Sequence, residues 1–310
     1  LFMQNEQLFD NMIDGAASLA ILIGAVVIFI GILPAIFLRE RLHEAPKIDT
    51  GNKVGKINFE KNDFKENIFS FFKGFGITLR VKPFLKLCLA TFLVFNGFML
   101  VSSFQYYVII YYVFGGDIGA GAEYAGYAGT LGAISTFFVI IFVTWLSTRI
   151  GKRRAFYITI SISMIGYALK WFCYNPDIPW LLLLPAPLIA FGLGGLFTLM
   201  PSMVADVVDY DELQTQERRE GMFGSIFWWV VKLGMAAALA GGGFILNATG
   251  FDVALGNSQT PQTILSMRIF DAFIPVITSA IAIWAVASYS LTEEKAHEIR
   301  MSLEAMRGTA

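Results

Sequence analysis

Two groups of residues in the sequence could do chemistry, and they lie close together in the chain. The first is Lys232, with Trp228 four residues before it, so that the two side chains share one helical face. An ammonium group beside an aromatic ring can bind a sugar ring or the carboxylate of a charged substrate. The second is a pair of carboxylates, Asp206 and Asp209, three residues apart at the end of an apolar run. The helix dipole opposes carboxylates at such an end, so both would be better placed facing cations, such as Arg218, Arg219 or a basic loop of another helix bundle. The alternative is that both simply lie at a solvated helix end.

The composition is that of a polytopic membrane protein. Of the 310 residues, 56% are hydrophobic and 15% are charged, against about 25% charged in an ordinary soluble domain. The net charge of −1 gives no case for nucleic acid as a partner. Cys88 and Cys173 both lie in apolar runs and are interpreted as core residues rather than as a disulfide. Seven runs are long enough to cross a hydrocarbon core of about 30 Å as helices, and they are predicted at residues 17–38, 84–114, 122–147, 154–174, 180–206, 221–247 and 269–291.

Basic residues alternate between the segments that connect these runs. Nineteen of the 23 Lys and Arg residues lie in four segments: 39–83, 148–154, 207–220 and the tail from residue 292. None lies in the four segments that alternate with them: 1–16, 115–121, 175–180 and 248–267. Basic segments stay on the cytoplasmic side of a membrane. The pattern predicts a multi-pass protein of the plasma or inner membrane, with its start outside and its tail in the cytoplasm.

The connecting segments divide the chain into four expected parts. Residues 1–38 would be an external loop and a transmembrane helix, and 39–83 a central cytoplasmic loop with an amphipathic helix at its end. Residues 84–291 would form a bundle of six helices, and 292–310 a cytoplasmic tail. Because the chain starts without methionine and without a signal-peptide pattern, we expect it to be a fragment whose beginning is missing.

Depth makes Lys232 the strongest candidate for a functional residue. It lies eleven residues beyond Gly221, roughly 16–17 Å along a helix and near the bilayer centre. A charge at that depth is costly and is usually functional. No other charge is expected at comparable depth. The alternative is a structural pairing of Lys232 with a carboxylate of another helix.

Two further features of the apolar runs have alternative interpretations. Asn96 and Tyr107 stand eleven residues apart and share one helical face, which either lines a water-filled cavity or bonds to a neighbouring helix. Small residues crowd the runs at 122–147 and 180–206. They either let helices pack closely or permit bending during a transport cycle.

The segments ADVVDYDEL, RREG and WWVVKLG resemble the glycoside–pentoside–hexuronide:cation symporter family of the major facilitator superfamily, to which melibiose permease belongs. The resemblance covers the whole chain and implies an all-α membrane fold, with the seven spans corresponding to helices 6–12 of a twelve-helix transporter. It implies symport of a small carbohydrate by alternating access, coupled to Na⁺ or H⁺ at a cation site mainly outside this chain. The implied partners are the substrate, membrane lipid and the missing N-terminal half of the same protein.

The resemblance also implies roles for individual residues. Lys232 matches a lysine that helps to shape the sugar and cation sites, and Phe227, Trp228 and Phe197 stand beside it where other members have different side chains, which favours a bulkier substrate. With Asn96 and Tyr107 these residues form the candidate substrate site. The candidate cytoplasmic gate is Asp206, Asp209, Tyr210, Arg218 and Glu220. The superfamily loop motif is TRIGKRR, with Arg149, Gly151, Lys152 and Arg153; Thr148 replaces its usual aspartate.

Alternative functions remain open from the sequence alone. A symporter of the same fold for a lysolipid or another amphiphile would suit the additional aromatic residues. A seven-helix receptor or retinal protein would share the number of spans and the single deep lysine. An enzyme is not expected, because the two histidines, His43 and His297, both lie in predicted cytoplasmic segments and leave no buried Ser–His pair or metal site. No cofactor is expected.

Overall fold

The computed structural model describes residues 12–37, 72–256 and 258–308. These residues are helical, with short connections and no β-strand among them. Seven of the helices are long and apolar enough to cross a membrane. The predicted all-α class and the predicted number of spans are confirmed. Helices suit this setting because each satisfies its backbone N–H and C=O groups internally, where lipid offers no hydrogen-bonding partner.

The chain divides into two units, residues 1–62 and 63–310, each described by itself. The described part of the first unit is α1, Met12–Phe37, which contains Pro34. In the second unit, a helical stretch at residues 72–78 leads to the bundle. This stretch overlaps the amphipathic helix expected at the end of the central loop, over residues 64–79, whose first half lies outside the described residues.

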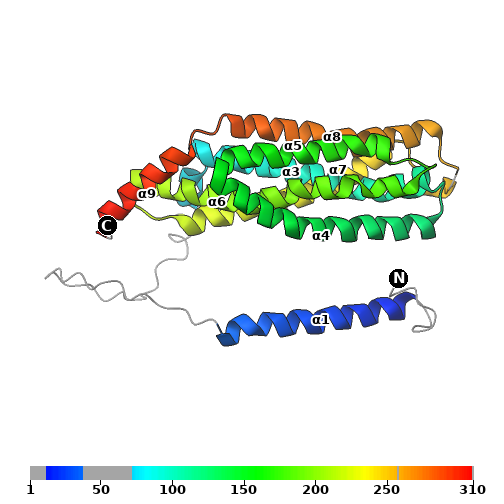
Figure 1. Cartoon of the computed structure of the whole chain (residues 1–310), viewed down its shortest axis with the longest axis horizontal. Coiled ribbons are helices and arrows are strands. Elements are labelled where there is room, and N and C mark those ends of the chain that lie inside the picture. Colours follow the sequence, from blue (N-terminus) through cyan, green and yellow to red (C-terminus); the bar gives the residue numbers. More distant parts are fainter. Residues whose placement is uncertain (1–11, 38–71, 257, 309–310) are drawn as a thin grey trace. The chain divides into compact units, whose positions relative to one another are not determined.

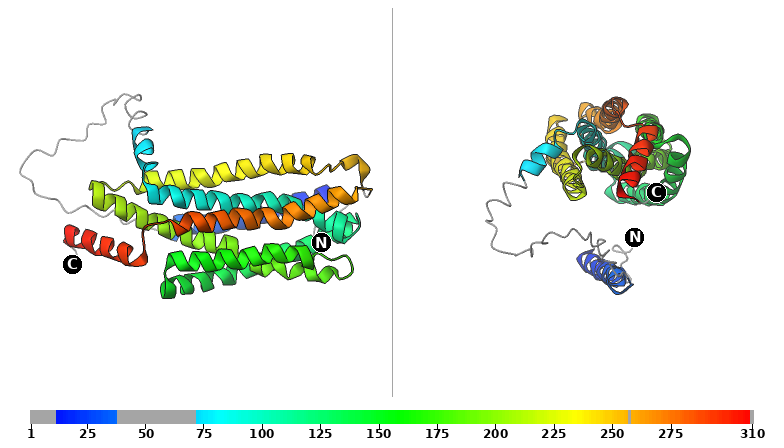
Figure 2. Two further views of the ribbon diagram at one scale, coloured as in Figure 1. Left: turned by 90° about the horizontal axis from the view of Figure 1, so that it is seen from above. Right: turned by 90° about the vertical axis from the view of Figure 1, so that its left-hand side faces the viewer.

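Six long helices form the bundle of the second unit, and a seventh, shorter helix closes the chain (Figure 1, Figure 2). Their bounds are α3 Lys82–Tyr107, α4 Ile118–Ile150, α5 Lys152–Cys173, α6 Pro185–Thr215, α7 Glu220–Ala248, α8 Pro261–Ala287 and α9 Glu293–Arg307. Three short elements complete them: the π-helix η1 at Val108–Val113, which directly continues α3, and the 3₁₀ turns η2 at Pro179–Leu183 and η3 at Val253–Leu255.

Two helix boundaries differ by eight or nine residues from those expected. Helix α8 begins eight residues before the predicted residue 269, because Thr260 caps its N-terminus by accepting a hydrogen bond from the Thr263 N–H at 3.2 Å and Pro261 occupies the first turn. Helix α6 continues beyond the predicted residue 206 to Thr215, and Gln216 ends it in the left-handed conformation with φ 59°. The charged tail is itself helical as α9.

The packing order leaves two helices at the edges of the bundle. Helix α3 packs against α7 and α8, α5 packs against α6 and α8, and α4 packs mainly against α6. The core between them includes Phe84, Phe156, Met200 and Phe223, all fully buried. By contrast, only 11% of the residues in the most apolar stretch of α4 are buried, and only 22% in that of α7. The outer faces of α4 and α7 therefore remain apolar surfaces of the bundle.

Close approach of α5 to α6 depends on glycine. A Cβ on Gly166 of α5 would lie 2.9 Å from the backbone nitrogen of Ile189, and one on Gly195 of α6 would lie 2.8 Å from the Cβ of Thr159. Small residues at such positions let transmembrane helices reach van der Waals contact. The helix-packing interpretation of these glycines therefore fits the α5–α6 contact.

Candidate functional site

The end of the bundle where α4, α6 and α8 finish carries Lys152, Arg218 and Arg300, and is called the basic end below. The opposite end, where α5 finishes and α6 and α8 begin, is called the distal end. Apart from Tyr107, which lies at the distal end, the candidate substrate residues lie between the two ends, and the candidate gate residues lie at the basic end.

Lys232 and Trp228 lie together on the outward face of α7. The Lys232 side chain is exposed, and its amine has no hydrogen bond or ion pair within the described part of the chain. Trp228 is half exposed, and the ring of Phe197 from α6 lies nearly parallel to it, 6.4 Å between centroids. Phe95 of α3 meets Phe197 edge-on at 5.9 Å. We call these four residues, Phe95, Phe197, Trp228 and Lys232, the aromatic–lysine cluster.

Phe227 does not share this face. Because successive helix residues turn by about 100°, Phe227 points inward, is 3% exposed, and belongs to the hydrophobic core. Its ring meets Trp228 edge-on at 5.7 Å. Phe227 was expected to contact the substrate directly, but its buried side chain instead packs against Trp228 from the core side.

Asn96 and Tyr107 of α3 lie in two different parts of the bundle. The Asn96 side-chain amide donates to the Phe92 carbonyl at 3.0 Å and lies against Gly234 of α7, where glycine leaves room for it. Tyr107 lies about 16 Å further along α3 and stacks on Tyr111, 6.4 Å between ring centroids. Asn96 thus takes part in the α3–α7 contact, close to the aromatic–lysine cluster, whereas Tyr107 belongs to an aromatic group at the distal end.

A pocket of about 450 Å³ lies between α3, α4 and α6. Small residues of α4 form one wall: Ala125, Ala128, Gly129, Gly132 and Ala133. Polar atoms come from Ser102, Gln105, Tyr106, Thr136 and Tyr174, and no charged side chain is among the lining residues. We call it the uncharged pocket. The sequence analysis did not predict this pocket. The small residues crowded between positions 122 and 147, which form its wall, were the feature that could have indicated it.

The uncharged pocket and the aromatic–lysine cluster follow one another along α6. Leu193 lines the pocket, and Phe197 of the cluster stands one helical turn further on. Both are at least partly exposed on α6. The two features together make a partly aromatic, partly polar surface with one cation, on the side of the bundle formed by α3, α4, α6 and α7.

At the basic end, Asp206 accepts hydrogen bonds from the Lys152 ammonium at 2.7 and 2.8 Å. The Asp206 side chain is 8% exposed, and Arg300 of α9 approaches it to 3.8 Å. The pair joins the loop motif to the candidate gate, a contact that sequence reasoning missed. The cations that face Asp206 come from its own bundle, whereas a basic loop of another bundle was one of the expected sources.

The loop motif has a defined structural role. Gly151 has φ 84°, a left-handed conformation that favours glycine, and it precedes the first turn of α5. The Lys152 N–H at that turn meets a carboxylate oxygen of Glu293 from α9, at 3.4 Å. Arg153 donates to the Tyr157 hydroxyl at 2.7 Å. The motif thus joins α5, α6 and α9, and Arg149 is exposed beside it.

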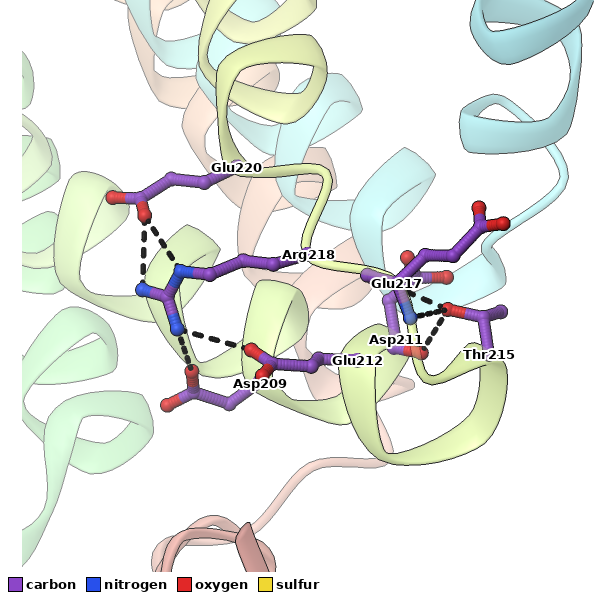
Figure 3. A network of polar contacts seen from close by, with 7 residues as sticks. All are labelled: Asp209, Asp211, Glu212, Thr215, Glu217, Arg218 and Glu220. Atoms are coloured by element: carbon purple, nitrogen blue, oxygen red, sulfur yellow. Dashed lines mark hydrogen bonds and ion pairs between the residues drawn. The ribbon is translucent and has the colours of Figure 1, made fainter. Parts of the chain in front are cut away.

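A second network at the basic end centres on Arg218 (Figure 3). Its guanidinium lies 2.9 Å from Glu220, 3.0 Å from Glu212 and 3.9 Å from Asp209. The hydrogen bond with Glu220, together with the charge of the nearby carboxylates, raises the pKa of Arg218. The Arg218 side chain is nearly half exposed, so solvent screens these contacts.

The two gate aspartates belong to separate networks. Asp206 faces Lys152, whereas Asp209 faces Arg218. A further carboxylate, Asp211, accepts three hydrogen bonds from Arg219, at 2.7, 2.7 and 3.0 Å, and is buried; sequence reasoning missed it. The other predicted gate residue, Tyr210, is partly buried against the core.

A fully buried ion pair joins α5 to α8. The Lys170 ammonium lies 2.7 Å from an Asp271 carboxylate oxygen, and the two side chains are 1% and 2% exposed. The pair adds two charges inside the bundle to Lys232 on its outer face. Asp271 was not expected there, because its span was predicted to begin at residue 269; with the start of α8 at Pro261, Asp271 stands ten residues, about 15 Å, along α8, and it meets Lys170 in the last turn of α5.

The chain matches the family described as MFS/sugar transport protein over residues 16–293. The chain belongs to this family, which is the glycoside–pentoside–hexuronide:cation symporter branch of the major facilitator superfamily. The predicted family is confirmed. The family consists of transport proteins, which supports a multi-pass membrane transporter rather than an enzyme, and disfavours the seven-helix receptor and the retinal protein.

Curated relatives in this family differ in what their names say they carry. The chain is 26% identical over 225 residues to a glucuronide carrier protein homolog of Escherichia coli, covering 73% of this chain and 48% of the relative. It is 24% identical to the isoprimeverose transporter of Lactiplantibacillus pentosus, covering 49% and 31%. It is 25% identical to the sodium-dependent lysophosphatidylcholine symporter 1 of Xenopus tropicalis, covering 80% and 47%. The chain spans about half the length of the curated relatives it matches, or less.

Proposed function

We propose that the protein is a secondary active transporter that carries a sugar, glycoside or uronide together with Na⁺ or H⁺ by alternating access. The observation that carries the proposal is the continuous surface formed by the uncharged pocket and the aromatic–lysine cluster. Hydroxyl and amide groups in the pocket suit a sugar ring, and an aromatic plate beside an ammonium suits a second ring or a carboxylate. Substrate sites in such transporters lie near the bilayer midplane, and the position of Lys232 near the middle of α7 supports a similar depth.

Lys232 supplies the first test. We predict that Lys232→Ala in the full-length protein abolishes substrate accumulation while the amount of protein in the membrane stays normal, because the exposed ammonium is lost from the middle of the surface. Lys295→Ala, which removes an exposed ammonium from α9, is the matched control and should keep full uptake. Uptake at the parent level by Lys232→Ala would remove Lys232 from the mechanism.

A second candidate substrate class is a lysolipid or a similar amphiphile. The exposed rings of Phe197 and Trp228, at 38% and 50%, offer apolar area that an acyl chain could cover. Relatives named as lysophosphatidylcholine symporters match the chain. Uptake of 4-nitrophenyl glycosides and glucuronides, measured beside uptake of a fluorescent lysophosphatidylcholine, separates the two classes. The carbohydrate proposal predicts uptake of the former and none of the latter.

Coupling and orientation belong to the same proposal. Replacing Na⁺ by K⁺ at constant pH, and then collapsing the proton gradient, shows which ion drives accumulation. The positive-inside pattern supports a cytoplasmic location for the basic end, so a cysteine introduced at Arg149 should react with a membrane-impermeant thiol reagent only after the membrane has been opened. Reaction in sealed cells would reverse the proposed orientation.

A further inference from the structure

The Lys170–Asp271 pair is the least exposed ion pair in the described part of the bundle, and neither the aromatic–lysine cluster nor the basic end uses it. Two ions sealed inside a helical bundle are costly to bury, and apolar residues of similar volume often replace such a pair without loss of stability. Polar and charged groups kept at membrane depth usually have a functional reason. The surroundings of the pair indicate what that reason is.

The pair lies next to a residue of the uncharged pocket. The Lys170 ammonium is 5.3 Å from the centre of the Tyr174 ring and 5.9 Å from that of Tyr167. Tyr174 is 3% exposed and is one of the residues that line the pocket. It therefore touches the buried ammonium and also forms part of the pocket wall. A desolvated cation beside an aromatic ring attracts it more strongly than one in water.

A second contact between α8 and α5 fixes the same region. Arg268, one turn before Asp271, has its guanidinium 3.8 Å from the centre of the Tyr112 ring and 4.5 Å from that of Trp171. It also donates to the Trp171 carbonyl at 3.0 Å. Tyr112 belongs to η1, which directly follows the part of α3 that lines the pocket. Two contacts from α8 thus hold the end of α5 and the end of α3 beside the pocket.

We propose that the Lys170–Asp271 pair positions the wall of the uncharged pocket. By holding Tyr174 in place, it makes the affinity and selectivity of transport depend on an ion pair that does not touch the substrate. This inference rests on the proposed function, because it assigns the pocket to the transported molecule. Since hydroxyl, amide and ring groups line the pocket and no charge does, its occupant is the neutral, hydroxyl-bearing ring of the substrate.

The test compares uptake of 4-nitrophenyl β-glucoside and 4-nitrophenyl β-glucuronide by variants of the full-length protein. Lys170→Met is expected to raise KM for both probes about tenfold, the scale of a lost buried cation–ring contact, while kcat changes less than about twofold. Lys170→Arg keeps the charge and should behave like the parent. Arg219→Gln breaks another buried pair, at the basic end, and should leave KM unchanged.

A double variant without the two charges of the pair controls for misfolding. Lys170→Met alone leaves the Asp271 carboxylate buried without a partner, which could prevent folding. Lys170→Met combined with Asp271→Leu leaves no unpaired charge between α5 and α8, so it should fold and still show the raised KM, because Tyr174 has lost its cation. A parent-like KM in the double variant would overturn the positioning role.

A second measurement needs no transport. Cys173 precedes Tyr174 and is 6% exposed. In a Cys88→Ser background, its rate of alkylation by N-ethylmaleimide reports whether the end of α5 has loosened. The rate should rise about tenfold in Lys170→Met, matching the lost contact, and stay low in Lys170→Arg. An unchanged rate contradicts the positioning role. If the parent takes up neither probe, the proposed carbohydrate function fails instead, and the alkylation rates still decide whether the pair holds this segment.

Discussion

Replacing Asp206 with asparagine removes the charge that joins α6 to the first turn of α5. The Asp206 side chain is 8% exposed and that of Lys152 is 19% exposed, with the ammonium 2.7 and 2.8 Å from the two carboxylate oxygens. Breaking a fully buried pair costs about 3–5 kcal/mol, whereas an exposed pair contributes about 0–1 kcal/mol. Because Lys152 keeps some contact with water, we expect Asp206→Asn to cost about 2–3 kcal/mol.

The matched control is Asp209→Asn, three residues along the same helix. Asp209 lies 3.9 Å from Arg218, whose side chain is 47% exposed and keeps Glu212 and Glu220 as closer partners. Its loss should cost less than about 0.5 kcal/mol. For a bundle of this size, 1 kcal/mol corresponds to about 2–4 °C in Tm. The expected decrease is therefore about 5–10 °C for Asp206→Asn and at most about 2 °C for Asp209→Asn.

The buried cysteines provide the assay. Cys88 and Cys173 are each 6% exposed, so a dye that fluoresces on reaction with thiols reports unfolding of the purified protein in detergent as the temperature rises. Equal decreases in Tm for the two variants would refute the reasoning, because they would show that the Lys152 contact is no stronger than a solvent-screened one.

Two further predictions concern stability. Gly166→Ala should lower Tm by several degrees relative to Gly224→Ala, because the new methyl group would meet the backbone at Ile189, whereas nothing lies within 4 Å at Gly224; equal Tm values in the same thiol-dye assay would contradict the close approach. Arg219→Gln should lower Tm by at least about 4 °C, because it leaves the buried Asp211 carboxylate without its partner, and a parent-like Tm would show that water reaches that carboxylate.

The helices could be predicted from the sequence because lipid imposes a simple rule. A run of apolar residues long enough to cross a membrane must be a helix, so the number and type of elements followed directly. Helix ends were less certain, because they depend on caps and turns. Thr260 and Pro261 start α8 within a segment that was interpreted as a loop, and that error concealed the depth of Asp271.

The candidate site could be predicted only in part. Helical spacing placed Lys232 and Trp228 on one face, and both lie there. Spacing cannot say which helices become neighbours, so the contacts of Asp206 with Lys152 and of Lys170 with Asp271 were missed. The uncharged pocket was missed for a related reason, since small residues on α4 indicate either close packing or empty space, and only the position of α6 decides between them.

Helix α9 has a consequence for how the protein is made. It is synthesised after the six long helices of the bundle, yet Ile299 and Leu303 enter the hydrophobic core, and Glu293 and Arg300 reach the first turn of α5 and Asp206. Domains generally fold from the N-terminus as the chain emerges from the ribosome. The basic end therefore stays incomplete until α9 has been translated, and a ribosome that stops before α9 releases a bundle whose apolar surface at the basic end is open to quality-control proteases.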